Sequence, residues 1–412
     1  MYQRLSAECE GLRDAVTDFA RKLILTPSPS LSESKVAGLV KRKMKKLHYD
    51  NAFLDDFGNV VGFILGRGQG PTLVLITHMD TAPSSSGNLA QEIPMTTANG
   101  RLTGPGAADC KGGLAAQVFA GGLLKRSLLP LEGNLVVAAT VAEESGSSLG
   151  VKGLIEKTLP ELGITPTYAI LGAPTDLGLY YGYDGWVAVE ITVTGEDSFQ
   201  VNLVKSTILD DLLGAMGGTR IEDRAETIVV HEISRHQTGE HYRATIEVGR
   251  RLRSGEAVAD ALDQLEHQAS PIAHFFGGVS VSAQVAQKVL ASSTAVVQKG
   301  TPPWYTDPFH PLLKQACHAL AAIGSKVHLG KWRLDRRCLG SAGSVLTNKY
   351  HLPTIGYGPG REETAHTGDE YVEIDNIRKA LFGTAVIAYD LIGIPVYEKE
   401  ADATYQPLRG TP

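Results

Sequence analysis

The feature that most constrains the fold is a series of short, almost wholly apolar segments separated by helical stretches. TLVLITHM at 72–79, LVVAATVA at 135–142 and YAILG at 168–172 have the length of strands. Strands that are apolar on both faces are typical of a parallel sheet covered by helices. The sequence therefore predicts an α/β fold with a mostly parallel sheet. Apolar periodicity predicts its helices near 8–26, 33–47, 113–125, 149–159, 310–323 and 375–391.

The pattern changes after Gly185. Residues 186–194 alternate between apolar and polar side chains, as a strand with one exposed face does. Helical and strand-like segments then follow in the order βαββαβ, which is the order of a ferredoxin-like domain. Because 412 residues are too many for one compact core, we expect two domains. One is formed by 1–185 together with 304–412, and the other is an insert at 186–303.

Charge and cysteine content narrow the classes of function. The net charge of −6 gives no basic surface for nucleic acid or for an anionic membrane. The apolar segments are far too short to span a bilayer, and the N-terminus lacks the pattern of a signal peptide. The cysteines are scattered and too few for a disulfide framework, which favours a reducing compartment: Cys9, Cys110, Cys317 and Cys338. We expect a cytoplasmic protein that binds neither nucleic acid nor membrane.

Acids and histidines follow the predicted strands. His78 and Asp80 end one strand, where alternate residues point the same way, so Asp80 can accept the second imidazole proton. Glu143 and Glu144 follow the most apolar strand, and adjacent buried carboxylates need a partner or a metal. Each pair also has a structural interpretation, as a solvated strand end or as the acidic start of a helix.

Two further candidates lie in loops that precede helices. Asp109 is in the glycine-rich segment GPGAADCKGG, where the main chain can approach a ligand closely. This segment is not a phosphate-binding P-loop, because it has no G-x-x-x-x-G-K-[ST] pattern. His366 is in TAHTGDEYVEI, just before the last helix. A single histidine in a loop does not by itself indicate a catalytic or metal-binding role.

The order of these motifs is more specific than any one of them. His-x-Asp, Asp-x-Lys-Gly, Glu-Glu and Ala-His-x-x-x-Glu-Tyr follow one another along the chain, with the βαββαβ insert before the last. This series resembles the di-zinc family of aminoacylases, carboxypeptidase G and succinyl-diaminopimelate desuccinylase. The resemblance covers nearly the whole chain and implies a zinc-exopeptidase-like fold whose insert is a lid that pairs into a homodimer.

The resemblance also implies roles for the matching positions. Asp109 matches the carboxylate that joins two metals, and the peptide bond after it is expected to be cis. Glu144 and His366 match the other ligands of one metal, whereas His78 matches a ligand of the second. Glu143 matches the general base that acts on the water between them.

This sequence departs from the family at substrate and metal positions. Ala173, in ILGAPTDLG, stands where the family has a glutamate or aspartate ligand. His78 and Asp109 alone are too few ligands for a usual zinc site, and Asp176 and Asp184 are near only in sequence. The lid histidine of the family is absent from VTGEDSFQVNLVKSTI at 193–208.

Two functional predictions follow. The first is a hydrolase of peptide or N-acyl amino acid amides, with catalytic Glu143 and Asp80. It holds one tightly bound Zn²⁺ per chain, rather than two, at Asp109, Glu144 and His366, with Co²⁺ or Mn²⁺ as alternatives. The second is a non-catalytic or altered homologue that keeps the fold and one metal and acts as a binding or assembly protein.

A serine hydrolase is a third class to consider, because residues 146–150 match G-x-S-x-G around Ser148. The preceding strand ends too early for the sharp turn of a nucleophile elbow, and two glutamates occupy its tip. We therefore prefer the metal interpretation.

Overall fold

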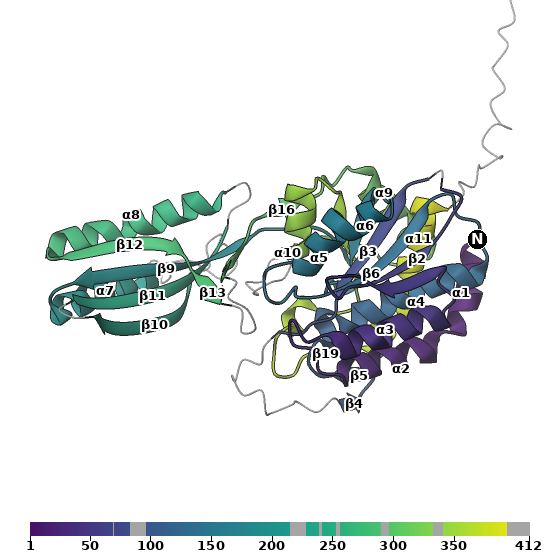
Figure 1. Ribbon diagram of the computed structural model, residues 1–412, viewed down its shortest axis with the longest axis horizontal. Coiled ribbons are helices and arrows are strands. Elements are labelled where there is room, and N and C mark those ends of the chain that lie inside the picture. Colours follow the sequence, from purple (N-terminus) through teal and green to yellow (C-terminus); the bar gives the residue numbers. More distant parts are fainter. Residues whose placement is uncertain are drawn as a thin grey trace, which may run out of the picture.

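The computed structural model has a broad α/β part and an elongated part that projects from it (Figure 1). It describes residues 1–68, 70–82, 96–214, 228–238, 241–252, 256–289, 296–332 and 341–393.

The broad part is built on a nine-stranded sheet. Its central strands run parallel, in the order β6 (Asn134–Thr140), β3 (Thr72–His78), β7 (Tyr168–Leu171) and β18 (Thr354–Gly356). The outer strands are β1 (Asn51–Leu54), β2 (Val60–Ile64), β8 (Leu179–Tyr183), β16 (Trp304–Tyr305) and β17 (Leu329–Trp332). Apart from β17, which pairs parallel with β8, these outer strands pair antiparallel. The predicted α/β class with a parallel centre is confirmed, and the antiparallel edges were not expected.

Helices cover both faces of this sheet (Figure 1). Leu73 and Leu75 of β3 face one hydrophobic cluster, while Val74 and Ile76 face the other, so β3 is buried on both sides. The hydrophobic cluster that contains Leu73 and Leu75 also draws on these helices: α1 (Tyr2–Glu10), α2 (Arg13–Ile24), α3 (Ser34–Lys46), α4 (Gly112–Ser127), α9 (Pro311–Ala322) and α11 (Ile374–Ile392). The hydrophobic cluster that contains Val74 and Ile76 draws on α5 (Leu149–Gly153), η2 (Leu154–Thr158), α6 (Leu159–Glu161) and η4 (Val345–Lys349).

The elongated part has the βαββαβ order that the sequence predicts. Its elements are β9 (Trp186–Gly195), α7 (Ser198–Gly214), β10 (Ile228–Thr238), β11 (His241–Arg251), α8 (Val258–Phe276) and β12 (Val279–Val285). The strand order β10-β11-β9-β12 is antiparallel throughout, and β15 (Gly300–Thr301) adds to β9 beside the return to the broad part. Helices α7 and α8 supply the apolar side chains that pack on this sheet.

Some helix bounds differ from the expectation. The helix expected over 8–26 is two helices, α1 and α2, which are separated at Gly11 and Leu12. Helix α8 runs to Phe276, well beyond the expected end near 267, and includes Pro271. Two small sheets were not predicted: β4 (Thr96–Ala98) with β5 (Arg101–Thr103) and β19 (Tyr371–Glu373), and β13 (Gln287–Val289) with β14 (Val296–Gln298). Within the described residues, every helix is too short or too polar to cross a membrane.

Gly113 allows the start of α4 to approach the end of β7. A Cβ at this position would lie 1.8 Å from the main-chain oxygen of Gly172. Because main chain cannot move aside as a side chain can, we expect Gly113→Ala to lower the free energy of unfolding by ~2–3 kcal/mol in urea denaturation. Gly38→Ala in α3 is the matched control, since its Cβ would meet only the flexible Arg42 side chain at 3.3 Å. It should raise stability by up to ~1 kcal/mol, and equal effects of the two substitutions would contradict this packing.

Candidate metal centre

The candidate site lies where the central strands end. His78 is the last residue of β3, and β6 ends just before the turn that carries Glu143 and Glu144. Carboxyl ends of parallel strands meet at one edge of a sheet, which is where α/β proteins place their sites. Asp109, from the loop before α4, and His366, from the loop before β19, join them there. The structure thus brings together residues from separate segments of the chain, as the motif order predicts.

One cluster consists of Asp109, Glu144 and His366. Nε2 of His366 lies 2.9 Å from Oε1 of Glu144 and 3.2 Å from Oδ2 of Asp109. One ligand atom from each residue lies within 4.8 Å of the others. Imidazole nitrogen and carboxylate oxygen are common ligands of divalent metals, so a donor set gathered this closely fits a bound metal ion.

A second cluster consists of His78, Asp109 and Cys110, which also offer ligand atoms within 4.8 Å of one another. Nε2 of His78 lies 3.2 Å from Oδ1 of Asp109. Asp109 therefore turns one carboxylate oxygen to each histidine. Sequence reasoning missed Cys110, because a cysteine without a paired cysteine gives no metal-binding spacing.

Electrostatics around these clusters favour a bound cation. Burial opposes protonation of His366, but Glu144 and Asp109 outweigh it and raise the pKa of His366 to about 11. Burial likewise opposes a charged His78, yet Cys110, Asp109 and Asp80 raise its pKa well above the ordinary value. Burial also raises the pKa of Glu144. The buried carboxylates therefore favour positive charge at this place, which protons on the two histidines supply and which a metal ion would supply after displacing them.

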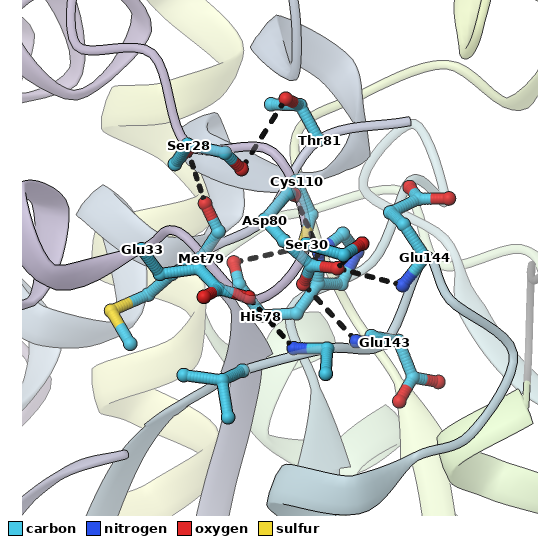
Figure 2. Close-up of polar contacts among 12 residues, drawn as sticks. Ser28, Ser30, Glu33, His78, Met79, Asp80, Thr81, Cys110, Glu143 and Glu144 are labelled. Carbon is cyan, nitrogen blue, oxygen red and sulfur yellow. Dashed lines mark hydrogen bonds and ion pairs between the residues drawn. The ribbon is translucent and has the colours of Figure 1, made fainter. Parts of the chain in front are cut away.

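Asp80 links His78 to the turn of the two glutamates (Figure 2). Nδ1 of His78 lies 3.0 Å from the main-chain oxygen of Asp80 and 3.4 Å from its Oδ1, which leaves Nε2 for the metal side. The carboxylate of Asp80 accepts the N–H of Glu143 at 3.2 Å and of Glu144 at 2.9 Å. Ser30 donates to the same carboxylate at 2.7 Å. Asp80 thus positions both a candidate ligand and the candidate base.

Glu370 holds the loop of Asp109 from the other side. Its carboxylate accepts the N–H groups of Gly106, Ala108 and Asp109 at 3.0, 2.9 and 2.9 Å. Burial raises the pKa of Glu370 to about 7. The peptide bond between Asp109 and Cys110 is cis, as the resemblance implies. Glu370 belongs to the Ala-His-x-x-x-Glu-Tyr motif, but nothing in the sequence shows that it reaches this loop.

Glu143 and Ala173 line a small cavity beside the second cluster. The cavity, of about 30 Å³, is also lined by His78, Asp109 and Cys110, and has room for a water molecule or an ion. Oε1 of Glu143 accepts the N–H of Ala342 at 2.6 Å. Ala342 lies in the short helix α10 (Ser341–Ser344), so this helix supports the candidate base.

The other acids and the serine considered from the sequence lie in different surroundings. Asp176 pairs with Arg361 and accepts a hydrogen bond from Asn376, and Asp184 pairs with Lys331. Neither is in the clusters that the described residues form. Oγ of Ser148 is buried and has no hydrogen-bond partner among the described residues, so no base activates it as a nucleophile there.

The model of Peptidase family M20/M25/M40 matches residues 74–386, which include every candidate residue above. The chain belongs to this family. The resemblance that the motifs indicate is confirmed, and the protein is a metal-dependent hydrolase of amide bonds.

Similar proteins support this assignment over most of the chain. YgeY from Escherichia coli strain K12, which is uncharacterized, is 26% identical over 86% of this chain and 89% of its own. A putative LysW-lysine/LysW-ornithine hydrolase from Pyrococcus furiosus is 26% identical over 88% of this chain and 93% of its own. The YXEP protein of Bacillus subtilis, a dinuclear metal-binding peptidase, superposes with a TM-score of 0.66 at 15% identity. The superposed region covers 93% of this chain and 100% of the YXEP chain, and this likeness supports the fold alone.

Proposed function

We propose that this protein hydrolyses the amide bond of a small peptide or N-acyl amino acid, with Glu143 as general base. The observation that carries the proposal is the convergence of Asp109, Glu144 and His366 within 4.8 Å, beside the cavity that Glu143 lines. These three residues would hold a Zn²⁺ ion, with Co²⁺ or Mn²⁺ as alternatives. Such an ion, when bound, polarises the scissile carbonyl and lowers the pKa of water.

Protein groups around the site position Glu143 for the proton transfers. Glu143 takes a proton from the attacking water and passes it to the leaving amine, so the reaction needs no covalent intermediate. The N–H of Ala342 holds Oε1 of Glu143, and Asp80 fixes the main chain of the same residue. Both contacts reduce the freedom of the base, so it stays oriented toward the cavity.

Metal removal gives the first test. A chelator should abolish turnover and lower Tm by several degrees, because a metal present at 100 times its Kd stabilises the fold by ~2.7 kcal/mol. Calorimetry and turnover should be followed on the same samples, with Zn²⁺, Co²⁺ or Mn²⁺ added back. Glu144→Gln is the control, since its Tm should respond far less to the added metal. A Tm and a turnover that chelation leaves unchanged would contradict the proposed site.

The substrate class is tested by a screen of N-acyl amino acids and dipeptides with the metal-loaded protein. Turnover that depends on the added metal supports the proposal. Two observations favour an alternative: Ala173 lines the cavity where a ligand is expected, and the histidine that the resemblance implies is absent from residues 193–208. A non-catalytic binding protein would take up metal and show no turnover with any member of the screen.

We further propose that residues 186–303 form a lid domain through which two chains pair. Strand β12 is an outer strand of its sheet, and an outer strand offers main-chain groups to a partner. We expect light scattering at micromolar concentration to give twice the chain mass of 44.0 kDa. Ser282→Lys, at an exposed position of β12, should weaken the dimer, whereas Ser206→Lys on the exposed side of α7 should not. A monomer in the unaltered protein would contradict the pairing.

A further inference from the structure

The second cluster has a metal-binding group that the family pattern does not supply. Ala173 contributes no ligand, which leaves His78 and Asp109 one donor short of the three protein ligands of a catalytic zinc site. Cys110 lies in the same cavity wall, is 1% exposed, and offers its Sγ within 4.8 Å of ligand atoms of both residues. The sulfur is also 3.6 Å from the main-chain oxygen of His78.

The surroundings of the cluster single out Cys110 as the missing donor. Asp80 occupies Nδ1 of His78, and Oδ1 of Asp109 faces Nε2 of the same ring. Asp176 and Asp184 are engaged with Arg361 and Lys331 and lie outside the cluster. A thiolate carries the same single negative charge as the carboxylate that Ala173 replaces, so the charge of the centre is preserved.

We propose that Cys110 is a metal ligand, and that His78, Asp109 and Cys110 hold a second ion beside the one at Asp109, Glu144 and His366. This inference rests on the metal-dependent function proposed above. It replaces the expectation of a single tightly bound metal with two per chain. As the metal bonds form, the thiol proton of Cys110 and the proton that His78 holds on Nε2 leave to solvent, so binding of the second ion releases protons.

The donor set also predicts which metal the second cluster prefers. Thiolate is a soft ligand that suits Zn²⁺ and Co²⁺, whereas Mn²⁺ prefers carboxylate and water. The first cluster has only imidazole and carboxylate donors. We therefore expect Zn²⁺ or Co²⁺ to fill both clusters, and Mn²⁺ to fill the first alone.

Cobalt substitution tests the proposal without reference to activity. The metal-free full chain should bind two Co²⁺ per chain, measured by elemental analysis after gel filtration. It should also show a thiolate-to-cobalt charge-transfer band in the near ultraviolet. Cys110→Ser should retain one Co²⁺ and lose the band. Cys317→Ser, on α9, is the matched control and should keep both.

A second variant keeps the test decisive if Cys110→Ser folds poorly. Ala173→Glu combined with Cys110→Ser restores a carboxylate at the family position, so it should bind two Co²⁺ without the band. Two Co²⁺ in Cys110→Ser alone, or two in the unaltered protein with no thiolate band, would overturn the inference. One Co²⁺ without a band would also overturn it while leaving the proposed function intact. No bound metal at all would instead remove the proposed function.

Discussion

Glu143→Gln is expected to lower kcat for any amide substrate that the protein hydrolyses by ~10²–10⁴-fold, the usual contribution of a general base. The substitution removes the group that takes the proton and changes little else. Asp80 holds the main-chain N–H of this residue, and the N–H of Ala342 can donate equally well to an amide oxygen. The metal content and the Tm of Glu143→Gln should therefore match those of the unaltered protein.

Steady-state kinetics on the metal-loaded protein measures this effect. Glu161→Gln, the same change at an exposed position of α6, is the control and should leave kcat unchanged. A kcat for Glu143→Gln within a factor of two of the control would exclude Glu143 as the base. If kcat fell by the expected factor but the bound metal was lost as well, Glu143 would instead have a structural role in the metal centre.

The sequence contains enough to predict the core of the fold. Segments such as 72–79 and 135–142 are apolar on both faces, and only burial in a covered sheet satisfies them. β8 and β16 were missed because they lie near the edge of the sheet, where a short strand needs no continuous apolar run. Their pairing depends on segments far apart in the chain, which local periodicity does not report.

The grouping of the residues in the first metal cluster could be predicted for a different reason. Asp109, Glu144 and His366 belong to motifs whose order along the chain is informative even though each motif is weak. The groups that orient the site have no such signal. Ser30 reaches Asp80 from the loop after α2, and Glu370 reaches the Asp109 loop from a distant segment. A buried carboxylate or hydroxyl resembles an exposed one in sequence until the fold gives it a partner.

Asp109→Asn is expected to weaken metal binding at both clusters by more than ~10²-fold, since loss of an outer partner alone costs ~10–100-fold. Oδ1 of Asp109 faces His78 and Oδ2 faces His366, so one carboxylate serves both clusters. An asparagine keeps one oxygen and replaces the other with an amide that donates hydrogen and cannot bind a cation. It also removes a buried negative charge that favours the metal ions.

Comparison with two other variants separates a shared carboxylate from a general loss of structure. Glu144→Gln should weaken binding at the first cluster only, because Glu144 contacts His366 and is not part of the second cluster. Asp80→Asn should weaken binding by ~10–100-fold, since Asp80 acts through His78 and the turn of the glutamates. Calorimetric titration of the metal-free proteins measures all three. If Asp109→Asn lost only one equivalent of metal, the two clusters would not share this residue. A Tm of metal-free Asp109→Asn equal to that of the metal-free parent would show that the fold is retained, and that the loss arises in the centre itself.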